Sequence, residues 1–107
     1  MRFPVFVLMK DCGEISQFRS VEAMQQHLEA IDIDNKEYLA WDAKGTSLEL
    51  GTQKPVWIKI EEKGNDQEAL IRALRAFAAS KGVEVKGNPS SLADIEALYQ
   101  AIAGKRR

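Results

Sequence analysis

The segment at residues 3–9 (FPVFVLM) places the strongest constraint on the fold. Its residues are apolar at odd and even positions alike, and the polar turn at residues 10–13 follows it. Strands with one face in water alternate apolar and polar residues, whereas strands buried on both faces are apolar throughout. The segment therefore predicts a central β-strand in a sheet that is covered on both sides.

The other apolar patterns predict four more strands. Residues 14–18 return from the turn at Gly13 and pair with residues 3–9 as a hairpin. Residues 37–42, 47–50 and 56–61 are short β-type runs separated by Gly-containing or Pro-containing segments. We expect these three runs to form an antiparallel meander.

Three stretches have the spacing of amphipathic helices. They cover residues 21–31, 66–81 and 92–103, with N-caps at Ser20, at Asn65 or Asp66, and at Ser90 or Ser91, and with Gly82 and Gly104 after the last two. The first helix should end near Ile31, because the polar segment at residues 32–35 breaks its pattern.

The order of elements is therefore β-β-α-β-β-β-α-α. Repeated β-α-β units, which parallel sheets require, are missing from this order. We expect an α+β fold, with three helices packed on an antiparallel sheet of four to five strands. A length of 107 residues is close to the commonest size of one domain, so we expect a single domain over residues 1–107.

Composition narrows the classes of function. A formal net charge of −1 gives no basic excess for binding phosphates, so we expect no nucleic-acid partner. No stretch approaches the ~20 apolar residues that a membrane span needs, and the apolar N-terminal run lacks a small-residue cleavage site. The single cysteine, Cys12, excludes an intramolecular disulfide and is typical of a reducing compartment. We therefore expect a soluble, cytoplasmic protein without a membrane partner.

No pattern of side chains predicts an active site, a metal site or a cofactor site. Asp32 and Asp34 resemble the start of a calcium-binding loop, but Lys36 and Glu37 stand where that loop needs an oxygen ligand and a glycine. His27 is the only histidine, and with a single cysteine it cannot complete a Cys/His zinc shell. The glycines lack the spacing of a phosphate-binding loop. We expect no metal and no cofactor, and we favour a protein that is not an enzyme.

The meander carries the candidate binding surface. Trp41 shares one face of its strand with Leu39, and Tyr38 lies on the opposite face. Trp57 shares a polar-patterned face with Lys59. Each tryptophan has a large apolar area, which must either be buried or form part of a binding surface. For Trp57, burial under the third helix or a loop and exposure in a binding patch both remain open.

The local charge favours a protein partner. Residues 20–50 contain seven acidic residues and two basic ones, which suits a basic partner. We therefore expect a small non-catalytic protein-binding domain, for example an inhibitor or immunity-type protein. The predicted protein-binding residues are Asp32, Asp34, Tyr38, Trp41, Trp57 and Lys59. Two alternatives stay open: a homo-oligomer that self-associates through a sheet face or edge, and an enzyme with an active site that involves His27.

Overall fold

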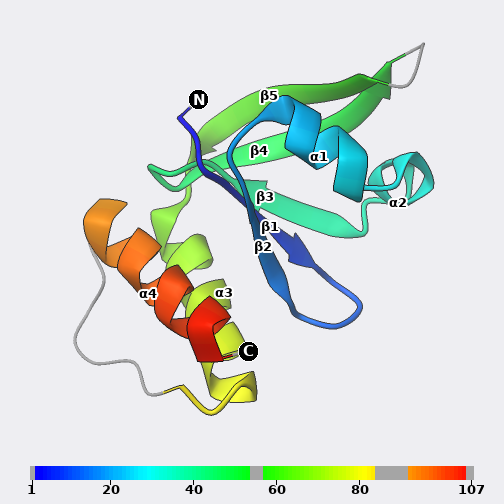
Figure 1. The fold of residues 1–107 in the computed structure, drawn as a ribbon. Helices are drawn as coiled ribbons and strands as arrows, with labels where there is room; N and C mark the ends of the chain where they lie inside the picture. The colour runs from blue at the N-terminus through cyan, green and yellow to red at the C-terminus, as the bar shows by residue number, and fades with distance from the viewer. Residues whose placement is uncertain (1, 54–56, 84–91, 106–107) are drawn as a thin grey trace.

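The computed structural model describes residues 2–53, 57–83 and 92–105 and arranges them as a five-stranded sheet with helices on both faces (Figure 1). The strands are β1 (Val5–Met9), β2 (Ile15–Phe18), β3 (Tyr38–Trp41), β4 (Thr46–Gln53) and β5 (Trp57–Asn65). The helices are α1 (Val21–His27), α2 (Ala30–Asp34), α3 (Gln67–Ser80) and α4 (Leu92–Lys105). The expected α+β class is confirmed, with four helices in the described residues in place of the expected three. None of these helices is long and apolar enough to cross a membrane.

The sheet is antiparallel, and its strand order is β2-β1-β3-β4-β5. β1 lies between β2 and β3, and Val5, Phe6 and Val7 are all buried. The prediction of an interior strand buried on both faces is therefore confirmed. The meander β3-β4-β5 is also confirmed, but β4 and β5 are longer than expected. The added residues, 51–53 of β4 and 62–65 of β5, are mostly polar or glycine, so a search for apolar patterns does not detect them.

Two clusters of apolar side chains lie on opposite faces of this sheet. Phe6 and Trp41 pack with α3 and α4 on one face. Val7 and Ala40, their neighbours in sequence, pack with Met24 of α1 on the other face. Side chains alternate between the two faces of a strand, so β1 and β3 contribute to both clusters.

The expected single helix over residues 21–31 is wrong, because the chain forms two short helices there. Ser20 caps α1 as predicted, and its Oγ accepts a hydrogen bond from the Ala23 amide at 3.1 Å. At Leu28 the backbone becomes extended, with φ −92° and ψ 137°. The chain then turns into α2, which places Ile33 in a buried position that the α1 periodicity does not include. The polar segment that was expected to follow the helix thus lies largely within α2.

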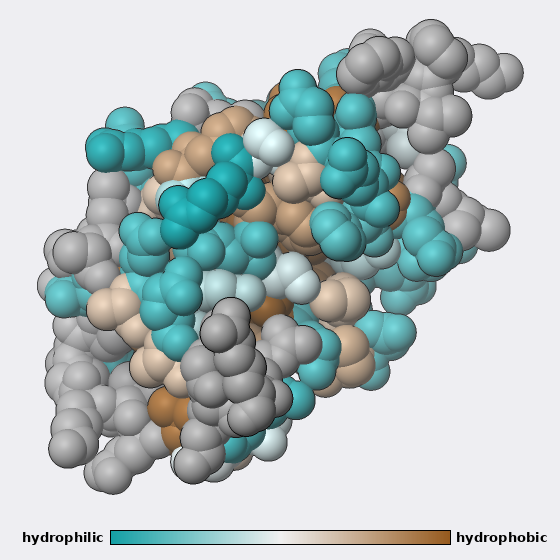
Figure 2. Space-filling model, in the orientation of Figure 1, coloured by the Kyte–Doolittle hydropathy of each residue, from teal (hydrophilic) through white to brown (hydrophobic). Residues whose placement is uncertain are grey.

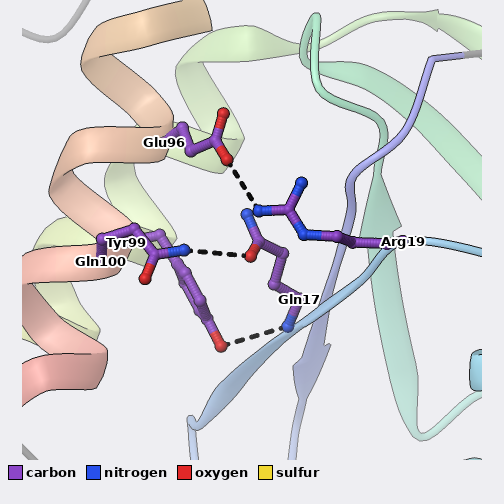
Figure 3. A network of polar contacts seen from close by, with 5 residues as sticks. All are labelled: Gln17, Arg19, Glu96, Tyr99 and Gln100. Atoms are coloured by element: carbon purple, nitrogen blue, oxygen red, sulfur yellow. Dashed lines mark hydrogen bonds and ion pairs between the residues drawn. The ribbon is translucent and has the colours of Figure 1, made fainter.

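α4 covers the outer edge of β2 with polar contacts (Figure 3). The Gln17 amide donates to Tyr99 Oη at 3.2 Å, and Gln100 Nε2 donates to Gln17 Oε1 at 3.2 Å. An ion pair between Arg19 and Glu96, with 3.0 Å between Nη2 and Oε1, lies beside them. An uncovered edge strand is a template for unwanted pairing, so these contacts protect the sheet on this side.

The helices α3 and α4 follow the sequence prediction closely. Gly82 has a φ of +71° after α3, as its expected role as a left-handed terminal residue requires. At the start of α3, Asn65 Oδ1 accepts a hydrogen bond from the Gln67 amide at 3.3 Å. The expected end of α4 at Gly104 is wrong by a residue, because the helix continues to Lys105. The predicted caps at Ser90 and Ser91 lie outside the described residues.

Candidate functional site

An early separation of β3 from β4 creates a groove beside α2. The two strands pair only at Ala40 with Leu48 and at Trp41 with Ser47, whereas β4 continues to Gln53. Helix α2 packs along the remaining part of β4 and is attached there by a hydrogen bond from Thr52 Oγ1 to Asp34 Oδ1 at 2.8 Å. The groove left between these elements has a volume of about 210 Å³. We refer to it as the α2–β4 groove.

The α2–β4 groove combines apolar walls with charged side chains. Its lining residues are Ile33, Tyr38, Leu39, Leu48 and Leu50, together with Lys10, Lys36, Ser47, Glu49 and Lys63. Leu39 is 43% exposed and is the one large apolar side chain with high exposure among the residues whose burial is described. Apolar contact area inside a polar rim is the usual composition of a protein-binding site.

The lysines of the groove differ in their partners. Lys63 Nζ lies 3.5 Å from Glu49 Oε2 and 3.4 Å from Glu61 Oε1. The hydrogen bond with Glu61 and the charges of both glutamates raise the pKa of Lys63. Lys10 and Lys36 form no ion pair with any described residue. Their charges are therefore available to a ligand.

Lys36 occupies an unusual position at the end of α2. The Lys36 amide donates to the Ile33 carbonyl at 3.0 Å, and the Glu37 amide donates to the Asp32 carbonyl at 2.9 Å. This pair of bonds is the Schellman motif, which ends a helix with a left-handed residue that is usually glycine. Lys36 adopts that conformation with a φ of +58°. A residue with a Cβ is strained there, so the position is less favourable for lysine than for glycine.

Three of the predicted binding residues gather beside this groove. The Tyr38 hydroxyl donates to Asp32 Oδ2 and accepts from the Glu29 amide, both at 3.4 Å. Burial raises the pKa of the Tyr38 hydroxyl, the hydrogen bond from the Glu29 amide opposes this rise, and the charge and hydrogen bond of Asp32 add to it. Asp34 is bonded to Thr52, as described above. The structure thus brings Asp32, Asp34 and Tyr38 together, and their polar atoms connect α2 to β3 and β4.

The other predicted residues lie elsewhere. Trp41 is 4% exposed in the cluster under α3 and α4, on the face of β3 opposite to Tyr38. Lys59 is exposed on β5 and pairs with Gly51 across the ladder. The side chain of Trp57 lies outside the described residues. The structure does not bring Trp41 together with Tyr38 on one surface.

Sequence reasoning missed the lysines that line the groove. Lys10 follows β1, Lys36 follows α2, and Lys63 belongs to β5, so these residues are remote from one another in sequence. Only their meeting in space gives them a shared role. The sequence gives one local indication, which is Lys36 at the end of α2. This indication requires that α2 be recognised as a helix separate from α1.

His27 lies beside a second groove. Its side chain is exposed, and its ring centroid is 5.9 Å from that of Phe18. Ser16, Tyr38 and His27 help to line this second groove, which has a volume of about 380 Å³. Apolar surface is visible in the middle of this face, between α1 and α4 (Figure 2).

Within the described ranges, no group of three or more His, Cys, Asp or Glu residues is placed to hold a metal ion.

The fold and the groove together define an α+β protein with a partly divided sheet. The chain matches no protein-family model, no curated protein sequence and no solved structure. Its function must therefore be inferred from the chemistry of its own surface.

Proposed function

We propose that this chain is a small non-catalytic protein-binding domain and that the α2–β4 groove receives an apolar side chain of its partner. The exposure of Leu39 carries this proposal. A single exposed leucine is common on protein surfaces. Leu39, however, borders a groove whose walls include Ile33, Leu48 and Leu50. A partner that covers Leu39 would extend an apolar surface that already exists.

The size of the groove favours a protein ligand over a small molecule. Pockets for small molecules usually have volumes of about 300–1,000 Å³. The α2–β4 groove, at about 210 Å³, is smaller and suits one or two side chains of a larger partner. Central apolar anchors within a polar rim supply much of the affinity of protein complexes. An inhibitor or immunity-type protein, which acts by occupying its partner, is one form of this function.

The test compares a groove variant with a matched surface variant. Leu39→Ser removes the apolar anchor, and Ala97→Ser makes a polar change at an exposed position on α4. Tagged wild type and both variants are used to capture proteins from the source cells, which are then identified by mass spectrometry. We expect the wild type and Ala97→Ser to retain the same partner, and Leu39→Ser to bind it about tenfold or more weakly.

Two results would count against this function. Retention of the same proteins by all three chains would remove the groove as the binding site. Failure of the wild type to retain any protein would contradict the function itself, unless the chain binds a second copy. Light scattering over a range of concentrations decides that case, because Leu39→Ser would then convert a dimer into a monomer.

A further inference from the structure

The charge at the α2–β4 groove is opposite to that of the surrounding sequence. Three lysines and one glutamate line the groove, in a chain with a formal net charge of −1. Glu49 lies within ion-pair distance of Lys63, and Glu61 contacts the same lysine. Lys10 and Lys36 have no such partner among the described residues. The groove therefore has an excess of positive charge.

Several carboxylates of residues 20–50 have hydrogen-bond partners inside the protein. Asp32 accepts a hydrogen bond from Tyr38, and Asp34 accepts one from Thr52. Asp42 is buried and accepts bonds from three backbone amides, those of Arg2 at 3.0 Å and of Lys44 and Thr46 at 2.9 Å. Three of the seven carboxylates of residues 20–50 are thus held in place by hydrogen bonds within the fold. In the lining of the groove itself, three lysines outnumber the single glutamate, and Lys10 and Lys36 have no ion-pair partner among the described residues.

The strained backbone at Lys36 is a further indication. Glycine would end α2 with the same two hydrogen bonds and without the cost of a Cβ in a left-handed conformation. Residues held in such conformations are concentrated at functional positions. Lys36 lines the groove, so its side chain offers a function that glycine lacks, namely a positive charge beside the apolar walls.

We infer that the α2–β4 groove binds an acidic segment of a protein, in which an apolar side chain is flanked by aspartate or glutamate residues. This inference rests on the proposed function, because it names the chemistry of the segment that the same groove receives. The apolar side chain contacts Leu39 and the groove walls, and the flanking carboxylates approach Lys10 and Lys36. Opposite charges across an interface speed encounter and reject partners of the wrong charge.

The first test uses short synthetic peptides as probes. Each has a central leucine and phenylalanine, and the flanking residues are all glutamate, all lysine or all serine. The peptides are titrated into the ¹⁵N-labelled full chain, and amide chemical shifts are followed by NMR. We expect the glutamate peptide to cause saturable shifts at Lys36, Leu39 and Leu50, and its affinity to fall as salt is added. The lysine peptide should cause no shifts at these residues.

The second test separates a ligand-binding role of Lys36 from a structural one. Lys36→Gly removes the charge and the backbone strain together. We expect the glutamate peptide to bind this variant about two- to fivefold more weakly, as for loss of one exposed charge pair. The melting temperature should rise by a few degrees. Lys44→Ser is the matched control, because it removes an exposed lysine that does not line the groove and should leave peptide affinity unchanged.

The outcomes distinguish this inference from the proposed function. Capture of a partner that depends on Leu39, combined with equal or tighter binding of the lysine peptide, would overturn the inference and leave the function standing. Absence of glutamate-peptide binding, or shifts confined to the second groove near His27, would also overturn it. Lys36→Gly with unchanged peptide affinity or a lower melting temperature would contradict the role assigned to Lys36.

Discussion

The two faces of the sheet are covered to different extents. On one face, α3 and α4 have fourteen residues each and seal a cluster that includes Phe6 and Trp41. On the other face lie α1, with seven residues, and α2, with five, and both grooves open beside these short helices. The comparison indicates that the long helices supply a large share of the stability. The part of the sheet that the long helices do not reach can then expose apolar and charged groups for binding.

The largest expected effect tests this division directly. Phe77 is 1% exposed in the cluster under α3 and α4, whereas Leu50 is half-buried at the α2–β4 groove. Phe77→Ala should reduce the free energy of unfolding by about 3–5 kcal/mol, through lost burial and the cavity that remains. Leu50→Ala should reduce it by about 1 kcal/mol. Urea denaturation followed by circular dichroism measures both, and equal losses would remove the proposed division between the faces.

The second prediction concerns the turn between β3 and β4, which contacts the start of α3 through a hydrogen bond from the Asp66 amide to the Gly45 carbonyl. Gly45 has a φ of +85°, and a Cβ added there would lie 2.6 Å from the Cα of Gln67. Gly45→Ala should therefore cost about 2–4 kcal/mol, from the left-handed backbone and from overpacking together. Gly13 has a similar φ of +74° with open space around it, so Gly13→Ala should show only the backbone cost, about 1–2 kcal/mol. Similar melting temperatures for the two variants would contradict this account of Gly45.

The third prediction compares two aspartates. Asp42→Asn replaces an oxygen of the buried carboxylate by an N–H donor that faces backbone amides. It should therefore reduce the free energy of unfolding by about 2 kcal/mol. Asp34→Asn changes an exposed carboxylate at α2 and should cost no more than about 0.5 kcal/mol. Thermal unfolding of the two variants measures the difference. A larger loss for Asp34→Asn would mean that α2 contributes more stability than its exposure indicates.

The smallest expected effect is the titration of Tyr38. Burial, together with the charge and hydrogen bond of Asp32, raises the pKa of its hydroxyl above the usual value of about 10, and this rise outweighs the lowering by the hydrogen bond from the Glu29 amide. The folded state thus holds this proton more tightly than the unfolded state does. Its contribution to stability is complete below about pH 10 and is lost as the pH rises through the raised pKa. The loss of stability in alkali should be shallower in Tyr38→Phe.

Ultraviolet absorbance of tyrosinate reports the same group directly. Asp32→Asn removes one of the charges that raise the pKa of Tyr38, so its titration should move toward lower pH in this variant. An unchanged titration curve would show that Asp32 does not act on Tyr38 in solution. The contact of α2 with β3 could then not be attributed to the hydrogen bond between Tyr38 and Asp32.

The sequence was most informative where local pattern and tertiary packing agree. The apolar run at residues 3–9 predicted an interior strand, and the amphipathic spacing before Gly82 predicted α3. The division between α1 and α2 was missed because it depends on a contact between Glu29 and Tyr38 and on the burial of Ile33, neither of which follows from helical periodicity.

The candidate site was predicted only in part, and Leu39 and Trp41 show why. They lie two residues apart on the same face of β3, so an alternating pattern treats them alike. The cover provided by α3 and α4 includes Trp41, which is 4% exposed, and leaves Leu39 43% exposed. The extent of a covering layer is a property of the whole fold. The same holds for the three lysines, which meet at the groove from separate elements.

The contacts of α4 with β2 have a consequence for how the chain is made. Translation is vectorial, so α4 leaves the ribosome after every strand of the described sheet. Until then Phe6 lacks Tyr99, its edge-to-face partner, and the outer edge of β2 lacks its polar cover. Nascent chains paused before α4 expose a strand edge and an apolar face together, the combination that favours aggregation. We therefore expect chains released before α4 is made to aggregate more readily than the full chain.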